Sequence, residues 1–242
     1  MLPSVSNSSP TPRSEFWAGI RAMFPLVVGA MPFGIVFGTL AIESGLSIAG
    51  TLAMSLFVFA GSAQFISLSL IATGTPLALI WLTTLVVNLR HILYAISLLP
   101  HVRQLPGQWR AIVGFWLTDE SFVVAIARYN QADSSPFKHW YYLGAAFFMY
   151  ANWQLSTAIG IWIGKQLADA TQWGLDFAMS VTFIGMVVPY VVTVPMLMTV
   201  LVSGITALLA NSLPHQLGLL VAALIGVVAG FTFEQYCFKE SR

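Results

Sequence analysis

The feature that most constrains this chain is a pair of long stretches that contain no charged side chain. No Asp, Glu, Lys or Arg occurs in residues 44–89 or in residues 177–233. Because about 20 apolar residues in a helix span a bilayer, each stretch is long enough to hold more than one span. A soluble domain needs a polar surface and could not bury stretches of this length in one core. The sequence therefore predicts an integral membrane protein.

The composition of the whole chain supports the same class. Hydrophobic residues make up 57% of the 242 residues and charged residues only 8%, against about 25% charged in an ordinary globular domain; the mean hydropathy is +0.81. The apolar runs lack the strict alternation of a membrane β-barrel, and backbone groups in lipid must be satisfied internally. We therefore predict an all-α, polytopic transmembrane helix bundle with about 7–8 helical segments, some broken at Pro or Gly near mid-membrane.

The chain is expected to divide into three parts: a disordered polar N-terminal tail (1–16), a transmembrane helical transport domain (17–236) and a short C-terminal tail (237–242). The first residues lack the basic-then-apolar pattern of a cleaved signal peptide, so the first span is expected to be retained. The hydrophobic segments fall at about 17–42, 47–72, 77–99, 109–129, 140–163, 176–192, 195–210 and 215–235.

The orientation of the bundle is weakly marked. Arg13 and Arg21 precede or open the first span, which favours a cytoplasmic N-terminus by the positive-inside rule. If segment 109–129 crosses the membrane, however, the basic residues before it and those after it lie on opposite sides. Either the charge signal is mixed or one segment does not fully cross.

Several classes of protein are excluded. The net charge of +1 gives no reason to expect a nucleic-acid partner. A single cysteine, Cys237, excludes a disulfide framework and a Cys-based zinc site, and the four histidines lack the helical pairing of a metal site. We therefore predict no metal and no cofactor. The nucleophile and metalloprotease motifs of intramembrane enzymes are also missing, so no enzyme is predicted.

The first segment has a helix breaker and glycines near its midpoint, and the next three segments have polar or charged side chains near theirs. A charged side chain at mid-bilayer costs about 2.5–3.5 kcal/mol, so such groups face the bundle interior and are functional candidates. We take these residues as candidates for substrate binding or coupling: Pro32, Gly34, Gly61, Ser62, Gln64, Asn88, Arg90, His91, Tyr94, Thr118, Asp119 and Glu120.

Each candidate also has a purely structural interpretation. A Pro or Gly in a membrane helix is commonly a kink, or a packing site as in the Gly-xxx-Gly pairs at 34 and 38, 160 and 164, and 226 and 230. Arg90 could simply lock helices together through Asp119 or Glu120. Because these two carboxyls lie 100° apart on a helix, one is expected to pair with Arg90 and the other to face a cavity.

The same inventory suits a zwitterionic solute. Backbone N–H groups at a broken helix fit a carboxylate, the carboxyls fit an ammonium group, and a titratable carboxyl suits proton coupling. The surrounding Phe and Met side chains suit an aliphatic side chain. A hydrophobic amino acid is therefore compatible, and other small amphipathic solutes stay open.

The ordered set of motifs that carries these residues resembles the AzlC family, the large subunit of AzlC/AzlD-type branched-chain amino acid exporters. The matching stretches are PFG at 32–34, FAGSAQF at 59–65, NLRHILY at 88–94, GFWLTDESF at 114–122 and GLDFA at 174–178. The resemblance implies export of valine, leucine, isoleucine or methionine across a bacterial inner membrane. It also implies a small hydrophobic AzlD-type membrane subunit as partner. The alternative is a channel-like or structural membrane subunit for another small amphipathic solute.

Overall fold

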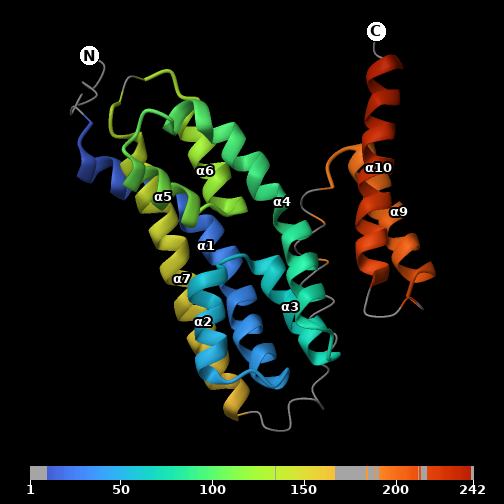
Figure 1. The fold of residues 1–242 in the computed structure, drawn as a ribbon. Helices are drawn as coiled ribbons and strands as arrows, with labels where there is room; N and C mark the ends of the chain where they lie inside the picture. The colour runs from blue at the N-terminus through green and yellow to red at the C-terminus, as the bar shows by residue number, and fades with distance from the viewer. Residues whose placement is uncertain are drawn as a thin grey trace. The chain divides into compact units, whose positions relative to one another are not determined.

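The computed structural model describes residues 10–133, 135–166, 184, 188, 191–211, 213 and 217–240, and every regular element in them is a helix (Figure 1). The prediction of an all-helical membrane protein is confirmed. The chain forms two compact units. The first comprises residues 1–42, 46–61 and 88–166, and the second comprises residues 43–45, 62–87 and 167–242.

Three long helices build the first unit: α1 (Pro12–Glu43), the second part of α4 (Leu77–Val102) and α7 (Lys138–Gln166). Among the described residues, α1 and α4 are long and apolar enough to cross a bilayer, and the 29 residues of α7 suffice by length. The first helix begins at Pro12 instead of Trp17. Proline suits the first turn of a helix, and the Thr11 hydroxyl accepts a hydrogen bond from the Ser14 backbone N–H (3.1 Å).

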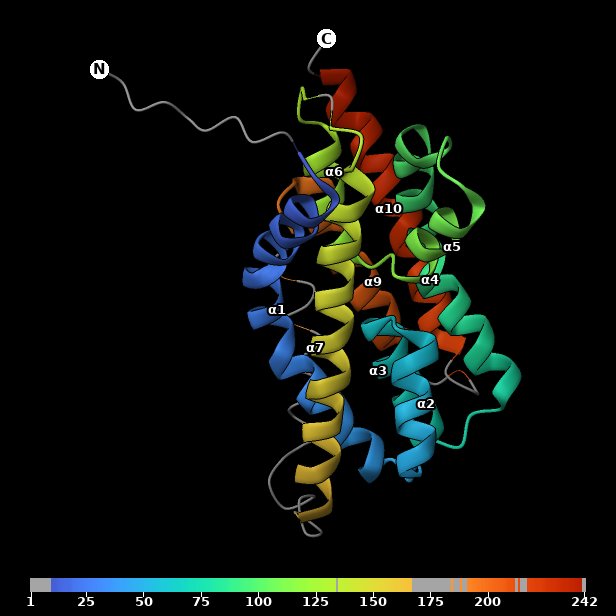
Figure 2. The same ribbon diagram turned by 90° about the vertical axis from the view of Figure 1, so that its left-hand side faces the viewer.

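Glycines let α1 and α7 pack at backbone contact. Gly19 lies against the carbonyl of Tyr141 and Gly38 lies against that of Thr157, so the two helices run parallel. A Cβ placed on Gly38 would lie 3.0 Å from the Cα of Gly160. Figures 1 and 2 both show the two helices side by side. The packing interpretation of the first two Gly-xxx-Gly pairs is confirmed.

Three helices of the first unit are too short to cross a membrane. They are α2 (Ile48–Val58), α5 (Gly107–Phe115) and α6 (Asp119–Tyr129), of 11, 9 and 11 residues. At 1.5 Å per residue each reaches about half of the roughly 30 Å hydrocarbon core. Two of the expected spans, 47–72 and 109–129, are therefore each broken into two helices.

Helices α5 and α6 form a hairpin whose start and end both lie at the end of the first unit where α4 ends and α7 begins. Ring contacts at the start of α5 and at the end of α6 show this. Trp109, at the start of α5, contacts the rings of His139 (4.5 Å) and Trp140 (5.1 Å) at the start of α7. Tyr129, at the end of α6, stacks on His101 (5.0 Å), near the end of α4. Of the two alternatives that the basic residues left open, the structure favours the one in which segment 109–129 does not fully cross. Hydropathy registers one apolar stretch of adequate length, whereas residues 116–118 interrupt the helix.

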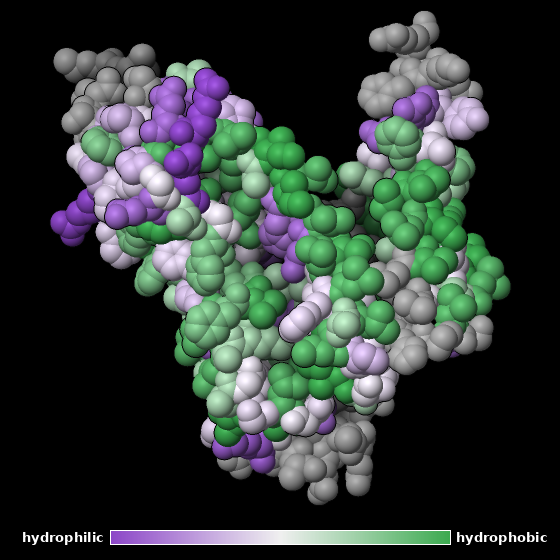
Figure 3. Space-filling view, viewed as in Figure 1, coloured by the Kyte–Doolittle hydropathy of each residue, from purple (hydrophilic) through white to green (hydrophobic). Residues whose placement is uncertain are grey.

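This re-entrant hairpin removes the conflict in the distribution of basic residues. Arg103 and Arg110 lie before and within α5, and Lys138 opens α7, all at the end of the unit where α1 begins. Figure 3 shows hydrophilic side chains gathered at this end and apolar side chains over the middle of the unit. The other end of α1 carries Glu43, and the last turn of α7 carries Lys165.

The second unit contains α3 (Gly61–Ala72, except Gly61 itself), the first part of α4, α9 (Val194–Leu209) and α10 (Leu217–Glu240). Helices α9 and α10 form an antiparallel hairpin, with a Cβ on Gly226 falling 2.7 Å from that of Ser203 and Gly230 packing on Thr199. The packing interpretation of this glycine pair is confirmed. The predicted segment 176–192 lies largely outside the described residues.

Candidate functional site

Asp119 is the centre of a polar cluster that joins α4 to the tip of the re-entrant hairpin. Its carboxylate accepts a hydrogen bond from the Tyr94 hydroxyl (2.5 Å) and pairs with the Arg90 guanidinium (2.9 Å). Arg90 and Tyr94 lie one turn apart on α4, as their spacing predicts. Asp119 is therefore the carboxyl that pairs with Arg90, and Glu120 lies at the next position of α6, half-buried.

The start of α6 explains why the chain breaks at this point. The Thr118 hydroxyl accepts from the Ser121 backbone N–H (3.3 Å), and the Ser121 hydroxyl oxygen accepts from the Thr118 N–H (2.8 Å). This capping box ends the non-helical stretch and begins a new helix. The positive end of the α6 dipole therefore lies at Asp119, and this dipole stabilises the Asp119 carboxylate.

The hairpin tip lies beside the middles of the two long helices α4 and α7. Arg90, the partner of Asp119, is close to the midpoint of α4. On the other side of the tip, the rings of Phe115 and Trp116 lie 6.2 Å and 5.6 Å from that of Tyr150, which is near the midpoint of α7. The charges thus lie level with the middles of two long helices, and their depth in a bilayer stays a prediction.

The end of α2 reaches the same tyrosine from the opposite direction. The ring of Phe59, at the break after α2, lies 4.8 Å from that of Tyr150. The Tyr150 hydroxyl donates to the carbonyl of Leu56 (3.0 Å), and the Gln154 amide donates to that of Ser55 (3.0 Å). The last carbonyls of a helix have no partner within that helix, and in lipid they need one. Side chains of α7 supply it, and both helix breaks of the first unit meet at Tyr150.

Two predicted glycines lie against another aromatic residue of α7. A Cβ on Gly61 would lie 3.2 Å from the Trp153 ring, and one on Gly34 would lie 3.6 Å from it and 2.6 Å from the Ser156 Cβ. Both glycines thus make room for α7. Helix α1 continues through Pro32, which is exposed, so the helix breaker expected there does not break the helix.

The remaining candidates divide between the two units. His91 and Asn88 share the Arg90 region: the His91 ring lies 5.8 Å from that of Tyr94, and its Nδ1 lies 3.2 Å from the Asn88 carbonyl oxygen. Ser62 and Gln64 belong to the second unit, where Gln64 is fully buried. The part that each candidate plays in binding or coupling stays a prediction.

Sequence reasoning missed Tyr150, Trp153 and an ion pair between Glu15 and Arg128. Tyr and Trp in membrane helices gather at the interfaces, so two of them in the middle of an expected span were the available signal. The ion pair joins residues 113 positions apart, through the Arg128 Nε (3.1 Å) and Nη2 atoms. Nothing in the local sequence of either residue indicates it.

Half-length helices that end at mid-depth, with a charged cluster at one tip, define a polytopic membrane protein with discontinuous helices. Such helices carry the binding sites of secondary transporters. Residues 25–167 match the family model described as AzlC protein. The chain belongs to the AzlC family, as its motifs predict, and is a membrane transport protein of that family rather than an enzyme.

The curated relatives agree with this assignment. The chain is 28% identical to the inner membrane protein YgaZ of Escherichia coli (strain K12), over 93% of this chain and 86% of the relative. It is 31% identical to the branched-chain amino acid transport protein AzlC of Bacillus subtilis (strain 168), over 74% and 70%. An uncharacterized membrane protein of Archaeoglobus fulgidus is 31% identical over 72% and 75%. No solved structure matches the chain.

Proposed function

We propose that this protein is a transporter subunit that exports branched-chain amino acids (valine, leucine, isoleucine), or similar hydrophobic amino acids such as methionine, across a bacterial inner membrane. The observation that carries the proposal is the meeting of two helix breaks at Tyr150, beside the Arg90–Asp119 pair at mid-depth. The name of the Bacillus subtilis relative supports the substrate class.

In this proposal each end of an amino acid has a partner in the polar cluster. Arg90 and the N–H groups that open α6 suit the carboxylate, because both present positive charge at the hairpin tip. Asp119 and Glu120 suit the ammonium group. Aromatic rings at the breaks, those of Phe59 and Trp116, suit an aliphatic side chain.

Saturable counterflow of labelled leucine in proteoliposomes tests the proposal. The protein is reconstituted with any subunit that co-purifies, preloaded with leucine, valine or an unrelated solute, and supplied with labelled leucine outside. A carrier gives counterflow that saturates and depends on preloading with a branched-chain amino acid. Flux that rises linearly with concentration, without counterflow, would instead indicate the channel-like alternative.

Proton coupling through the paired carboxyls is part of the proposal. Asp119→Asn and Glu120→Gln keep the shape of each side chain and remove its titration. At least one variant is expected to lose accumulation against a gradient while it retains exchange. If both variants still accumulate leucine when a pH gradient is applied, this pair does not carry the proton.

The proposed orientation places the N-terminal end in the cytoplasm, because the basic residues of the first unit gather there. Gln104→Cys and Ala132→Cys, each made in a Cys237→Ser background, put single thiols at exposed positions in the loops before and after the hairpin. An impermeant reagent should label both from the cytoplasmic side only. Labelling from opposite sides would contradict the re-entrant fold.

A small AzlD-type membrane subunit is the proposed partner, as the family assignment supports. Purification from native membranes should recover a membrane protein of a few helices together with this chain. Full transport by the chain alone in liposomes, at the rate of native membranes, would show that no partner is needed.

A further inference from the structure

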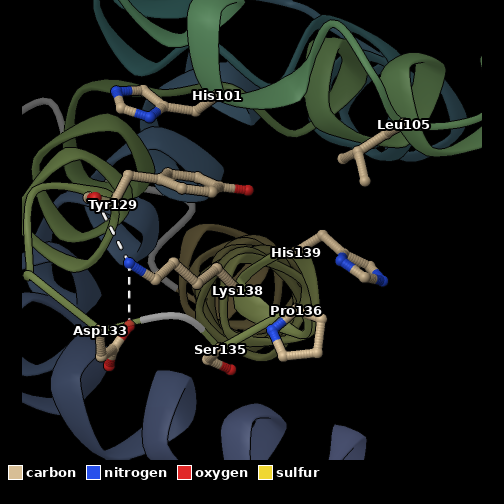
Figure 4. Close-up of a pocket in the computed structure, with 8 residues that line it drawn as sticks. All are labelled: His101, Leu105, Tyr129, Asp133, Ser135, Pro136, Lys138 and His139. Atoms are coloured by element: carbon tan, nitrogen blue, oxygen red, sulfur yellow. Dashed lines mark hydrogen bonds and ion pairs between the residues drawn. The ribbon is translucent and has the colours of Figure 1, made fainter.

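The charged groups at the base of the re-entrant hairpin, where α6 ends, neutralise one another. Arg128 pairs with Glu15 and with Asp133 (2.7 Å), and Lys138 pairs with Asp133 (2.9 Å). Figure 4 shows the Lys138 ammonium between the Asp133 carboxylate and the backbone carbonyl of Tyr129. Both carboxylates at the base therefore have cationic partners within the protein.

The tip of the hairpin differs from its base, because its two carboxyls are not equally paired. Asp119 pairs with Arg90 and accepts from the Tyr94 hydroxyl, so each of its two oxygens has a donor. Glu120 makes no ion pair in the part of the chain that the structure describes. Its carboxyl is hydrogen-bonded to neutral groups, its own backbone N–H and the Thr118 side chain. Among the described residues of the first unit, Glu120 is therefore the one carboxyl without a paired cation.

This difference decides where a further cation is stabilised. Glu120 is half-buried, and an ionised carboxylate that leaves water without a partner is unfavourable, so a cation that joins it is stabilised. Asp119 gains less from a further cation. The Arg90 guanidinium already lies 2.9 Å from one of its oxygens, and a second positive group at the same carboxylate would be repelled. The hairpin tip therefore favours one added cation, at Glu120.

The spacing of these groups fits the two charges of an α-amino acid. Both charges are attached to one carbon atom, so the protein groups that receive them must be neighbours. Arg90 is held at Asp119, and Glu120 is the next residue, whose Cα lies about 3.8 Å from that of Asp119. Because adjacent side chains lie about 100° apart around a helix, Glu120 is not directed toward α4 as Asp119 is. The tip thus offers separate partners for an anion and a cation.

We propose that the two carboxyls have different tasks. Glu120 binds the ammonium group of the transported amino acid, and Asp119 is a positioning residue that holds Arg90 for the carboxylate of the solute. The inference rests on the proposed function, because it divides the roles within that same site. Glu120 is then a specificity-determining residue: it distinguishes an amino acid from a carboxylic acid of the same shape that lacks the ammonium group.

Equilibrium dialysis of labelled leucine and of labelled isocaproate, which is leucine without its amino group, tests this division of roles. The purified full chain is used with any subunit that co-purifies. The wild type is expected to bind leucine at least about tenfold more tightly than isocaproate, because isocaproate cannot form the charged hydrogen bond to Glu120. Glu120→Gln should weaken the binding of leucine and not that of isocaproate, since it removes a negative charge beside the acid. The preference for leucine should therefore disappear.

Asp119→Asn is the matched control, because it makes the same chemical change at the neighbouring position. It releases Arg90, so it should weaken the binding of both solutes by a similar factor and keep the preference for leucine. Glu120→Asp keeps the carboxylate and should also keep the preference. Asp133→Asn removes a carboxylate at the base of the hairpin and should change neither affinity.

A thermal melt establishes that each variant is folded, and Glu120→Met, which also removes the charge, replaces Glu120→Gln if that variant does not fold. A folded Glu120 variant that keeps the preference, or that loses both solutes equally, would overturn the division of roles and leave the proposed function intact. Loss of the preference in Asp119→Asn alone would overturn it too, because the ammonium group would then belong to Asp119. A wild type that binds leucine no better than isocaproate would have the same consequence. Absence of any leucine binding would contradict the proposed function itself.

Discussion

Two ion pairs at opposite ends of α6 offer a direct test of what Arg90 does. Arg128 pairs with Glu15 at the base of the hairpin, and Arg90 pairs with Asp119 at its tip. Arg90→Gln and Arg128→Gln make the same chemical change at the two places. We expect Arg128→Gln to lower stability more, and Arg90→Gln to lower transport more.

The structure sets the size of each effect. The Arg128 and Glu15 side chains are 9% and 6% exposed, so removing the guanidinium leaves a buried carboxylate and costs about 3–5 kcal/mol. The Arg90 side chain is 32% exposed, and its partner Asp119 would keep the hydrogen bond from Tyr94. A cost of about 1–2 kcal/mol lies between the values for exposed and buried pairs.

Thermal melts in detergent and leucine efflux per folded protein in proteoliposomes measure the two effects. Arg128→Gln combined with Glu15→Gln should regain stability, because neither charge is then left alone. Arg90→Gln combined with Asp119→Asn, or with Glu120→Gln, should still fail to transport. Recovery of transport in either Arg90 double variant would refute the functional role and leave Arg90 as a lock between helices.

Three further outcomes are expected. Tyr150→Phe removes the donor to the Leu56 carbonyl and leaves that acceptor unpaired, so it should cost about 1–3 kcal/mol of stability and keep transport, whereas Tyr150→Ala should abolish efflux. Gly38→Leu should destabilise the fold by at least about 1–3 kcal/mol because its side chain would meet the backbone of α7, while Gly29→Leu, with open space around it, should not. The hydrogen bond from Lys138 lowers the pKa of Asp133 from its usual 3.8; its contribution to stability is therefore present above about pH 4 and lost as the pH falls through the lower folded-state pKa. Melts between pH 6 and pH 2 should show Asp133→Asn lose less stability than the wild type.

The class of the protein and much of the polar cluster follow from the sequence alone. Charge-free stretches are specific to membrane proteins, and the helical period places Arg90 and Tyr94 on one face of α4. The pairing of Arg90 with one of two adjacent carboxyls follows from the cost of burying a charge. Whether Asp119 or Glu120 is the partner depends on where α6 begins, because the start of the helix sets the direction of each side chain. The Thr118 cap fixes that start.

The re-entrant hairpin and the role of α7 could not be read from the same patterns. Hydropathy measures the length of an apolar stretch and not whether its two ends lie on one side, so only the conflict between the basic residues before and after 109–129 indicated an incomplete crossing. Tyr150 contacts the end of α2 and the break between α5 and α6, which lie far away in the sequence. The hydrophobic periodicity of α7 alone does not indicate such contacts. The packing role of the glycine pairs, by contrast, could be predicted, because close approach of two helices requires small residues.

The carbonyls at the end of α2 impose an order on biogenesis. Their partners on α7 lie 94 and 99 residues later in the chain. When α2 leaves the ribosome these acceptors have no protein donor, so they must stay hydrated or outside the lipid until α7 has been synthesised. Helix α2 is therefore expected to enter the bilayer after the long helices, as a late step of folding. It is not expected to insert in the order in which the chain is synthesised. A chain truncated before α7 should leave α2 open to proteases that the complete protein resists.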